Sequence, residues 1–277
     1  MKNILVPVDF SELSKVAARY AIGMATAHNY RIHLFAVQDI NPGAHALMNK
    51  YKLEEEIARA TQEDGAALVK RLKALSDKPV DIIFATQTGY PIYSVIESYV
   101  HAEKIDLIVM GSQGASGLKK VFLGSNAAGV INHSSIPVIV VPPNAVYNGI
   151  QSIVYATDMA HIDHEVHQIK DLIQDFGAQL HIIHVVLEGS PEDVAQPIVP
   201  SADVTNIPYA SNHFHVFKSA PVAEAIDDFV VLQKADLLAL FTHKLEFFEK
   251  LFDTSVTRQL AFHSHVPLLS FNKTTSG

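Results

Sequence analysis

The chain has 277 residues, of which 48% are hydrophobic and 18% charged, and it contains no cysteine. This composition predicts a folded protein with room for one large or two ordinary domains, and it excludes disulfides, thiolate metal sites and cysteine nucleophiles. The formal net charge of -8 argues against a general nucleic-acid binder, which would need a basic face.

Strand-like apolar runs alternate with helical periodicity through the first half. Met1 and Lys2 lead directly into the first strand and no apolar run reaches 18 residues, so we expect a cytoplasmic protein with no signal peptide and no membrane contact. Five strands joined by crossover helices predict a parallel sheet with helices on both faces. In chain order we predict strand 4–9, a helix after Ser11, strand 31–37, a helix over about 47–76, strand 80–86, a helix after Pro91, strand 106–110, a helix over 121–133 and strand 137–141.

The second half of the chain repeats the first. Residues 104–107 align with 234–237 at an offset of 130, and this register continues without a gap as far as Pro137 and Pro267. Near the start of each half the offset is 149, so the second half is shorter by 149 - 130 = 19 residues.

The missing residues and the boundary between the halves can both be located. Residues 188–211 contain four prolines, which cannot continue a helix, so we predict that an irregular segment replaces the long second helix of the first half. Turn residues at 142–149 separate two predicted domains, 1–143 and 150–277.

A glycine motif follows the predicted strand that ends at Met110. It reads Gly111-x2-Gly114-x9-Gly124-Ser125 and leads into a predicted helix. Glycines let backbone approach a ligand closely, and free amides at a helix start favour an anion such as phosphate. The spacing fits neither the Walker A motif nor the GxGxxG motif of dinucleotide-binding folds. The residues alone therefore leave two interpretations open, a nucleotide site or an ordinary glycine-rich loop.

This motif, together with a first strand that ends in Pro7-Val8-Asp9 and is followed by Ser11, resembles the universal stress protein family. The resemblance covers the whole chain as two tandem domains, with both motifs complete only in the first. It implies an α/β fold of two flavodoxin-like domains, each an open five-stranded parallel sheet of order 3-2-1-4-5 with helices on both faces. It also implies ATP binding in members that carry the glycine motif.

The resemblance assigns a complete adenine-nucleotide site to the first half, for ATP, ADP or AMP, with Mg²⁺ beside the phosphates. Asp9, which follows Pro7 and Val8 at the end of the first strand, would form a hydrogen bond with adenine. Val37 would pack against the base. Met110 and Gly111 would lie by the ribose, and the phosphates would contact Gly114, Gly124, Ser125 and the amide of Asn126. Ligands of open α/β sheets bind outside the carboxyl ends of the strands, which agrees with this placement. The alternative for Asp9 is a helix cap or turn residue before Ser11.

The second half departs from the motif. The residues at the positions of the three glycines are Phe241, Lys244 and Thr254, and only Ser255 matches. A phenylalanine at the first position would fill the space of the ribose, although Asp158 remains at the base end. We therefore expect a degenerate domain with a structural or regulatory role.

The apolar fifth strands, residues 138–141 and 268–271, lie at sheet edges in the family's strand order. In the family these edges pair antiparallel across a dimer, so we expect an intramolecular pseudo-dimer here, and a further homodimer stays open.

No catalytic or metal-binding residues are predicted, because no GxSxG elbow, HExxH motif or cysteine nucleophile occurs. His161, His164 and His167 follow one another at a spacing of three, which allows a two-histidine contact with zinc or simply a polar helix face. Three functions remain open: a nucleotide-binding stress or signalling module with an unidentified protein partner, a weak ATP hydrolase, and a nucleotide-free interaction scaffold.

Overall fold

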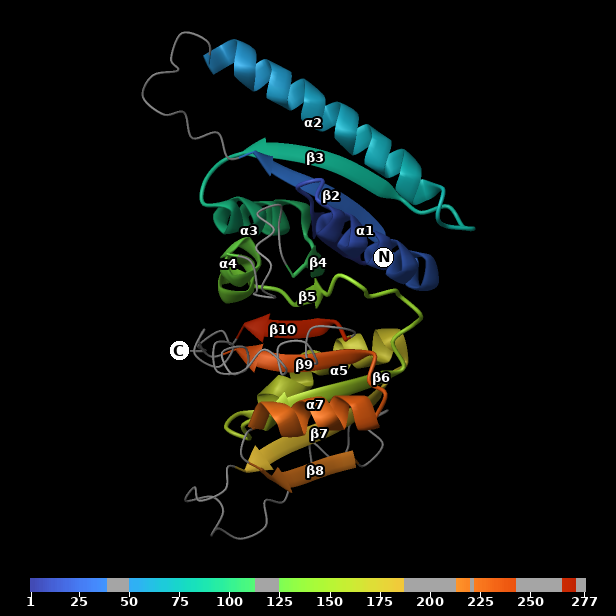
Figure 1. The fold of residues 1–277 in the computed structure, drawn as a ribbon, viewed down its shortest axis with the longest axis vertical. Coiled ribbons are helices and arrows are strands. Elements are labelled where there is room, and N and C mark those ends of the chain that lie inside the picture. Colours follow the sequence, from blue (N-terminus) through green and yellow to red (C-terminus); the bar gives the residue numbers. More distant parts are fainter. Residues whose placement is uncertain (39–49, 113–124, 187–212, 220–221, 243–265, 273–277) are drawn as a thin grey trace. The chain divides into compact units, whose positions relative to one another are not determined.

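The protein is represented by a computed structural model that describes residues 1–38, 50–112, 125–186, 213–219, 222–242 and 266–272 (Figure 1). The chain divides into two compact units, Met1–Tyr147 and Asn148–Gly277. Each unit is a parallel sheet flanked by helices. None of the described helices combines the length and the apolar character that crossing a bilayer requires.

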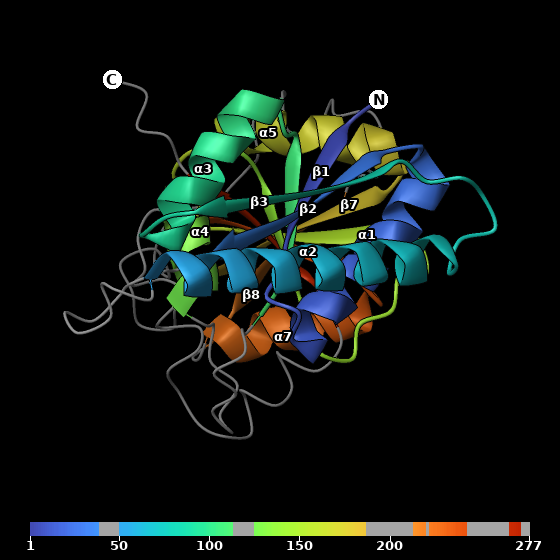
Figure 2. The ribbon, with the colours of Figure 1, turned by 90° about the horizontal axis from the view of Figure 1, so that it is seen from above.

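The first unit contains a five-stranded sheet in the order β3-β2-β1-β4-β5, which confirms the predicted order 3-2-1-4-5. All four strand pairs are parallel. Helices α1 and α2 contact one another, and α3 contacts α4; Figure 2 shows α3 on the other side of β2 from α1 and α2. The elements are β1 (Asn3–Pro7), α1 (Glu12–His28), β2 (Arg31–Gln38), α2 (Lys50–Lys73), β3 (Ile82–Thr88), α3 (Ile92–Glu103), β4 (Leu107–Gly111), α4 (Ser125–His133) and β5 (Val138–Val141).

Local sequence signals explain where α1 begins and ends. Ser11 has extended backbone angles and its hydroxyl accepts a hydrogen bond from the amide of Ser14, so it caps the first turn. Asn29 adopts the left-handed conformation that commonly ends helices. The buried face of α1 is rich in alanine, which lets the helix approach the sheet closely.

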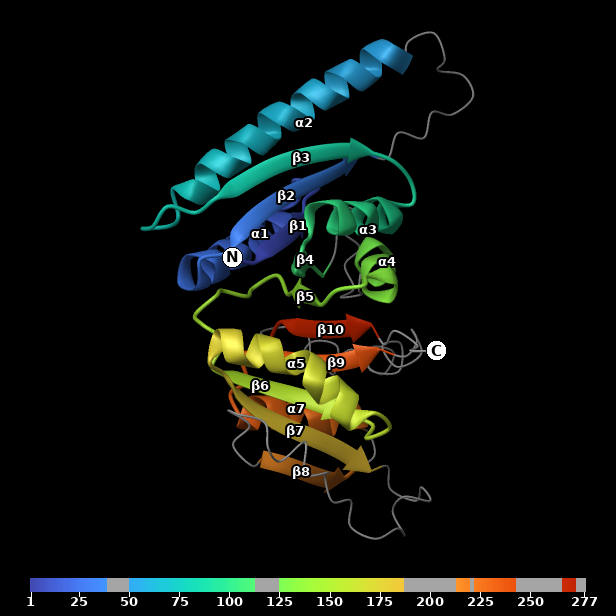
Figure 3. The ribbon, with the colours of Figure 1, turned by 180° about the vertical axis from the view of Figure 1, so that it is seen from behind.

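The expected second and fourth helices are both present in the described part of the chain. The second helix, described as Lys50–Lys73, ends before the expected residue 76, whereas residues 47–49 of its expected range lie outside the described residues; it lies along β3 (Figure 3). A glycine permits this contact, since a Cβ atom on Gly65 would lie 2.1 Å from the ring of Phe84. The fourth helix is described from Ser125, and residues 121–124 of its expected range lie outside the described residues.

The second unit repeats this topology in the order β10-β9-β6-β7-β8. The strand register matches the sequence repeat: Ile4 pairs with Leu107 in the first sheet and Ile153 with Leu237 in the second, at offsets of 149 and 130. The segment 188–211, for which we predicted an irregular structure, lies outside the described residues. The elements are β6 (Ser152–Thr157), α5 (Ile162–Phe176), β7 (Gln179–Val186), β8 (His213–Lys218), α7 (Val222–Leu232), β9 (Leu237–Thr242) and β10 (Leu268–Asn272).

Tyr147, which follows β5 after a short connection, packs against α1. Its ring meets Tyr20 edge-on at a centroid distance of 5.3 Å, and its hydroxyl lies 3.0 Å from Nε2 of His28. Gly23 makes room for this ring, because a Cβ atom there would lie 2.6 Å from Cδ1 of Tyr147. A glycine at position 23 therefore permits the contact, at a cost in helix propensity.

We expect Gly23→Ala to have opposite effects in two backgrounds. In the parent it should lower the free energy of unfolding by about 1 kcal/mol, because it displaces the ring of Tyr147. In the Tyr147→Ala background it should raise that free energy by about 1 kcal/mol, the helix-propensity gain of alanine over glycine. Urea unfolding of the four proteins measures both effects, and the same sign in both backgrounds would contradict the contact.

Candidate functional site

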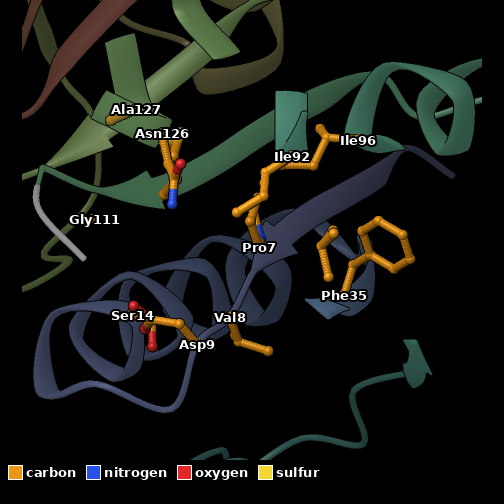
Figure 4. Close-up of a pocket in the computed structure, with 12 residues that line it drawn as sticks. Pro7, Val8, Asp9, Ser14, Phe35, Ile92, Ile96, Gly111, Asn126 and Ala127 are labelled. Atoms are coloured by element: carbon orange, nitrogen blue, oxygen red, sulfur yellow. The ribbon is translucent and has the colours of Figure 1, made fainter. Parts of the chain in front are cut away.

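An open pocket lies at the carboxyl ends of β1, β2 and β4, where α1, α3 and α4 approach the sheet. It encloses about 560 Å³ of space, including open solvent at its mouth. The part formed by Val8, Phe35, Val37, Ile92 and Ile96 is apolar, whereas Asp9, Ser14 and Asn126 supply polar groups. In Figure 4, Gly111 and Asn126 stand at one end of the view and Phe35 at the other. Such a cavity can accept a ligand that has both an apolar ring and polar substituents.

The structure brings together most of the residues predicted for the nucleotide site. Seven of the ten predicted residues line the pocket: Pro7, Val8, Asp9, Val37, Met110, Gly111 and Asn126. Ser125 is the exposed first residue of α4 and is not among the lining residues. Gly114 and Gly124 lie outside the described residues, so their role stays a prediction.

Asp9 is held in a fixed turn at the pocket wall. Its Oδ1 atom accepts hydrogen bonds from the amide of Ser11 at 3.0 Å and from the hydroxyl of Ser11 at 2.5 Å. Phe10, between them, has a φ of 60°, so this turn uses the left-handed conformation. Asp9 is thus a turn residue, as the alternative interpretation held, and it also lines the pocket.

Gly111 has a packing role that the sequence did not indicate. A Cβ atom there would lie 2.9 Å from the carbonyl oxygen of Leu13, in the first turn of α1. The glycine therefore lets the end of β4 lie against α1, in addition to forming part of the pocket wall.

The sequence reasoning missed five of the lining residues. Phe35 could have been found from Val37, because residues two apart on a strand share one face. Ile92 and Ile96 are four apart on α3 and share one helix face in the same way. The full set of missed residues is Ser14, Phe35, Ile92, Ile96 and Ala127.

Hydrogen-bonding groups also lie at the two ends of the segment 113–124, which itself is outside the described residues. On one side, the hydroxyl of Ser112 is buried and has no hydrogen-bond partner among the described residues. On the other side, α4 is described from Ser125. At the far end of α4, Nδ1 of His133 lies 2.8 Å from the Gly129 carbonyl, so this side chain caps the last turn of the helix.

The second unit contains a polar cluster around β6, the strand that corresponds to β1. Tyr155 donates a hydrogen bond to the carboxylate of Glu165, and the hydroxyl of Thr157 lies 3.4 Å from the same oxygen. Nδ1 of His184 lies 2.9 Å from the Thr157 carbonyl. Burial, and then the charge of Glu165, raise the pKa of Tyr155, so its hydroxyl keeps its proton and remains a donor.

Each member of this cluster replaces a small apolar residue of the first unit. Strand β6 aligns with β1 at an offset of 149. The strand pairings then align β7 with β2 at an offset of 148. The buried positions of α5 align with those of α1 at the same offset of 148. With these offsets the replaced residues, all buried, are Val6, Val8, Ala17 and Ala36.

Phe241 adds further bulk at the position of Gly111. Its ring is stacked on Phe271 at 4.6 Å and meets Tyr155 at 5.6 Å. The second unit thus fills with its own side chains the region that corresponds to part of the first unit's pocket wall. Lys244 and Thr254, the other departures from the motif, lie outside the described residues.

The histidines at the start of α5 form no recognisable metal centre. His161 precedes the helix as its N-cap residue, so only His164 and His167 lie on it. Within the described part of the chain, no group of three or more histidine, aspartate or glutamate residues is placed to hold a metal ion.

Comparison with known proteins relates both units to one family. The model of the universal stress protein family matches residues 1–142 and again residues 149–271. The chain belongs to the universal stress protein family. A universal stress protein of Methanocaldococcus jannaschii is 33% identical over 143 residues, which cover 50% of this chain and 81% of that protein. One from Thermus aquaticus is 31% identical over 140 residues, covering 50% of this chain and 98% of that protein.

A solved structure extends the likeness in fold over both units. The universal stress protein from Archaeoglobus fulgidus has a TM-score of 0.67 to this chain, at 20% identity, with 98% of each chain covered. At this identity the comparison supports the tandem universal stress fold and no shared ligand.

Proposed function

We propose that the first unit binds an adenine nucleotide, ATP, ADP or AMP, and acts as a stress-response or signalling module. The observation that carries this proposal is the pocket at the carboxyl ends of β1, β2 and β4, which is the ligand position of open α/β sheets. Asp9 would accept from the amino group of adenine, and Val37 would pack against the ring.

The polar end of the pocket suits the phosphates. Asn126 lies in the first described turn of α4, and the amides and dipole at the start of this helix would favour an anion. Ser112, which follows Gly111 in the chain, would supply a second donor; its hydroxyl is buried without a partner among the described residues, although Ser112 does not itself line the pocket. Mg²⁺ would accompany the phosphates. The second unit, in which Phe241 occupies the position of Gly111 and Thr157 that of Val8, would serve as a partner domain within an intramolecular pseudo-dimer.

Asp9→Asn is expected to weaken ATP binding by about tenfold to a hundredfold. The asparagine oxygen can still accept from Ser11, so the turn is kept. The substitution replaces the second carboxylate oxygen by an NH2 group. Because this group and the adenine amino group are both hydrogen-bond donors, the hydrogen bond between them is lost. Isothermal titration of the full chain with ATP and Mg²⁺ measures the change.

The second unit provides the matched control. Asp158 occupies the same turn, and its Oδ1 accepts from the amide of Ala160 at 2.9 Å. Asp158→Asn should leave the affinity unchanged. Equal affinities of the parent and Asp9→Asn would exclude this site, and no binding by the parent would favour the nucleotide-free scaffold.

A further inference from the structure

One face of β2 connects a buried histidine to the pocket. His33, Phe35 and Val37 alternate along the strand and therefore share a face. Phe35 and Val37 line the pocket, whereas His33 lies one step deeper and is only 2% exposed.

The histidine contacts the helix that forms one wall of the pocket. Its Nδ1 atom lies 3.1 Å from the hydroxyl of Tyr99 on α3. The ring of Tyr99 is in turn stacked on Phe35, at a centroid distance of 4.1 Å and an interplanar angle of 22°. Because α3 also supplies Ile92 and Ile96 to the pocket, the packing of Tyr99 helps to set the position of that wall.

This packing suits a neutral imidazole better than a charged one. Nε2 of His33 is buried and has no hydrogen-bond partner among the described residues, so a second N–H at the ring would be buried together with a positive charge. The charged groups that act on it are Glu103 of α3, Arg31 of its own strand and Asp81 before β3. Burial is the largest effect and lowers the pKa of His33; Arg31 acts in the same direction, and the two carboxylates oppose it.

We propose that His33 is a proton sensor of the nucleotide pocket: protonation of its imidazole loosens α3 from β2 and weakens nucleotide binding. This inference rests on the proposed function. If α3 moves away and His33 meets water, the histidine regains its usual pKa of about 6.5. The packed state is therefore fully favoured above about pH 6.5, and it loses stability as the pH falls from there toward the lowered pKa of the packed state.

Linkage gives the direction of the effect on binding. A nucleotide that contacts Phe35 and Ile96 holds α3 against the sheet and so lowers the pKa of His33 further. Proton binding then weakens nucleotide binding by the same factor, about tenfold for each unit of difference between the bound and free pKa values.

The second unit offers a matched control position. His181 is the equivalent residue of β7, by the offset of 148 in the strand pairings, and it too is buried. The position of Tyr99, at an offset of 130, is occupied by Phe229, which has no hydroxyl group. The tyrosine contact that carries the proposal is thus a feature of the first unit.

The test is the ATP affinity of the full chain between pH 8 and pH 5, measured by isothermal titration. We expect the parent to lose about threefold to tenfold more affinity than His33→Leu over this range, whereas His181→Leu should follow the parent. Titration of ATP itself affects all three proteins equally, so the difference between the profiles reports on His33. Identical profiles of the parent and His33→Leu would overturn the proposal.

A second measurement separates this proposal from the proposed function and does not depend on a variant that folds. The NMR titration of the His33 Cε1 proton in the parent should give a pKa below the usual value, which falls further when ATP is added. Amides of α3 should lose protection from hydrogen exchange on acidification, after correction for intrinsic rates. No ATP binding at pH 8 would reject the proposed function, whereas an ordinary His33 pKa with unchanged α3 protection would reject the sensor.

Discussion

Tyr155→Phe is expected to lower the free energy of unfolding of the second unit by about 1.5–3 kcal/mol, the value of a hydrogen bond to a charged group. The hydroxyl that is lost donates to Glu165, whose side chain is buried with a residue exposure of 1%. Removing the donor leaves the carboxylate in an apolar environment with less compensation. Glu165→Met is expected to cost about 1–3 kcal/mol, because it leaves the buried hydroxyl of Tyr155 without its acceptor.

The double variant Tyr155→Phe/Glu165→Met should cost much less than the sum of the two single changes. It removes donor and acceptor together, and Thr157 keeps a partner because its hydroxyl also accepts from the amide of Met159 at 2.9 Å. We expect a coupling energy of about 1–3 kcal/mol between the two positions.

Urea unfolding of the full chain measures these free energies, and hydrogen exchange assigns the loss to β6 and α5. Tyr90→Phe is the control, since that ring is 77% exposed and its change should stay within about 0.5 kcal/mol. Additive losses from Tyr155→Phe and Glu165→Met would contradict the cluster as described.

The strands and helices could be predicted from the sequence because the patterns that specify each of them lie within a short stretch of the chain. Short apolar runs predict strands and helical periodicity predicts helices, and caps such as Ser11 and Asn29 mark the ends of α1. The strand order could not be read from periodicity, since it depends on which strands meet in space; it came from the family resemblance, and the strand pairings confirm it.

The pocket residues Asp9, Val37 and Met110 could be predicted from the family resemblance, and the rule that ligands of open α/β sheets bind at the carboxyl ends of the strands agrees with that placement. The contact between Gly111 and Leu13 could not, because it joins residues about a hundred positions apart through backbone atoms. The polar cluster of the second unit was hidden by a one-residue change of register. At a uniform offset of 149, Glu165 falls on Val16, and only the burial of α5 shows that it replaces Ala17.

Gly111→Val is expected to affect both stability and binding in the first unit. The first added atom, Cβ, would lie 2.9 Å from the carbonyl oxygen of Leu13, and a backbone atom cannot move aside as a side chain does. Either β4 or the first turn of α1 must shift, at a cost of about 1–3 kcal/mol in the free energy of unfolding.

That shift would be transmitted to the pocket, because the first turn of α1 carries Ser14 and follows the Asp9 turn. The valine methyl groups would also enter the pocket wall to which Gly111 belongs. We therefore expect ATP affinity to fall by about a hundredfold, which corresponds to about 2.7 kcal/mol. Met110→Leu, a change of shape at nearly constant volume in the adjacent wall residue, should cost less than about 1.5 kcal/mol in stability and leave most of the affinity. Isothermal titration and urea unfolding of both variants test this; a Gly111→Val protein with parental stability and affinity would show that the close approach of β4 and α1 does not shape the pocket.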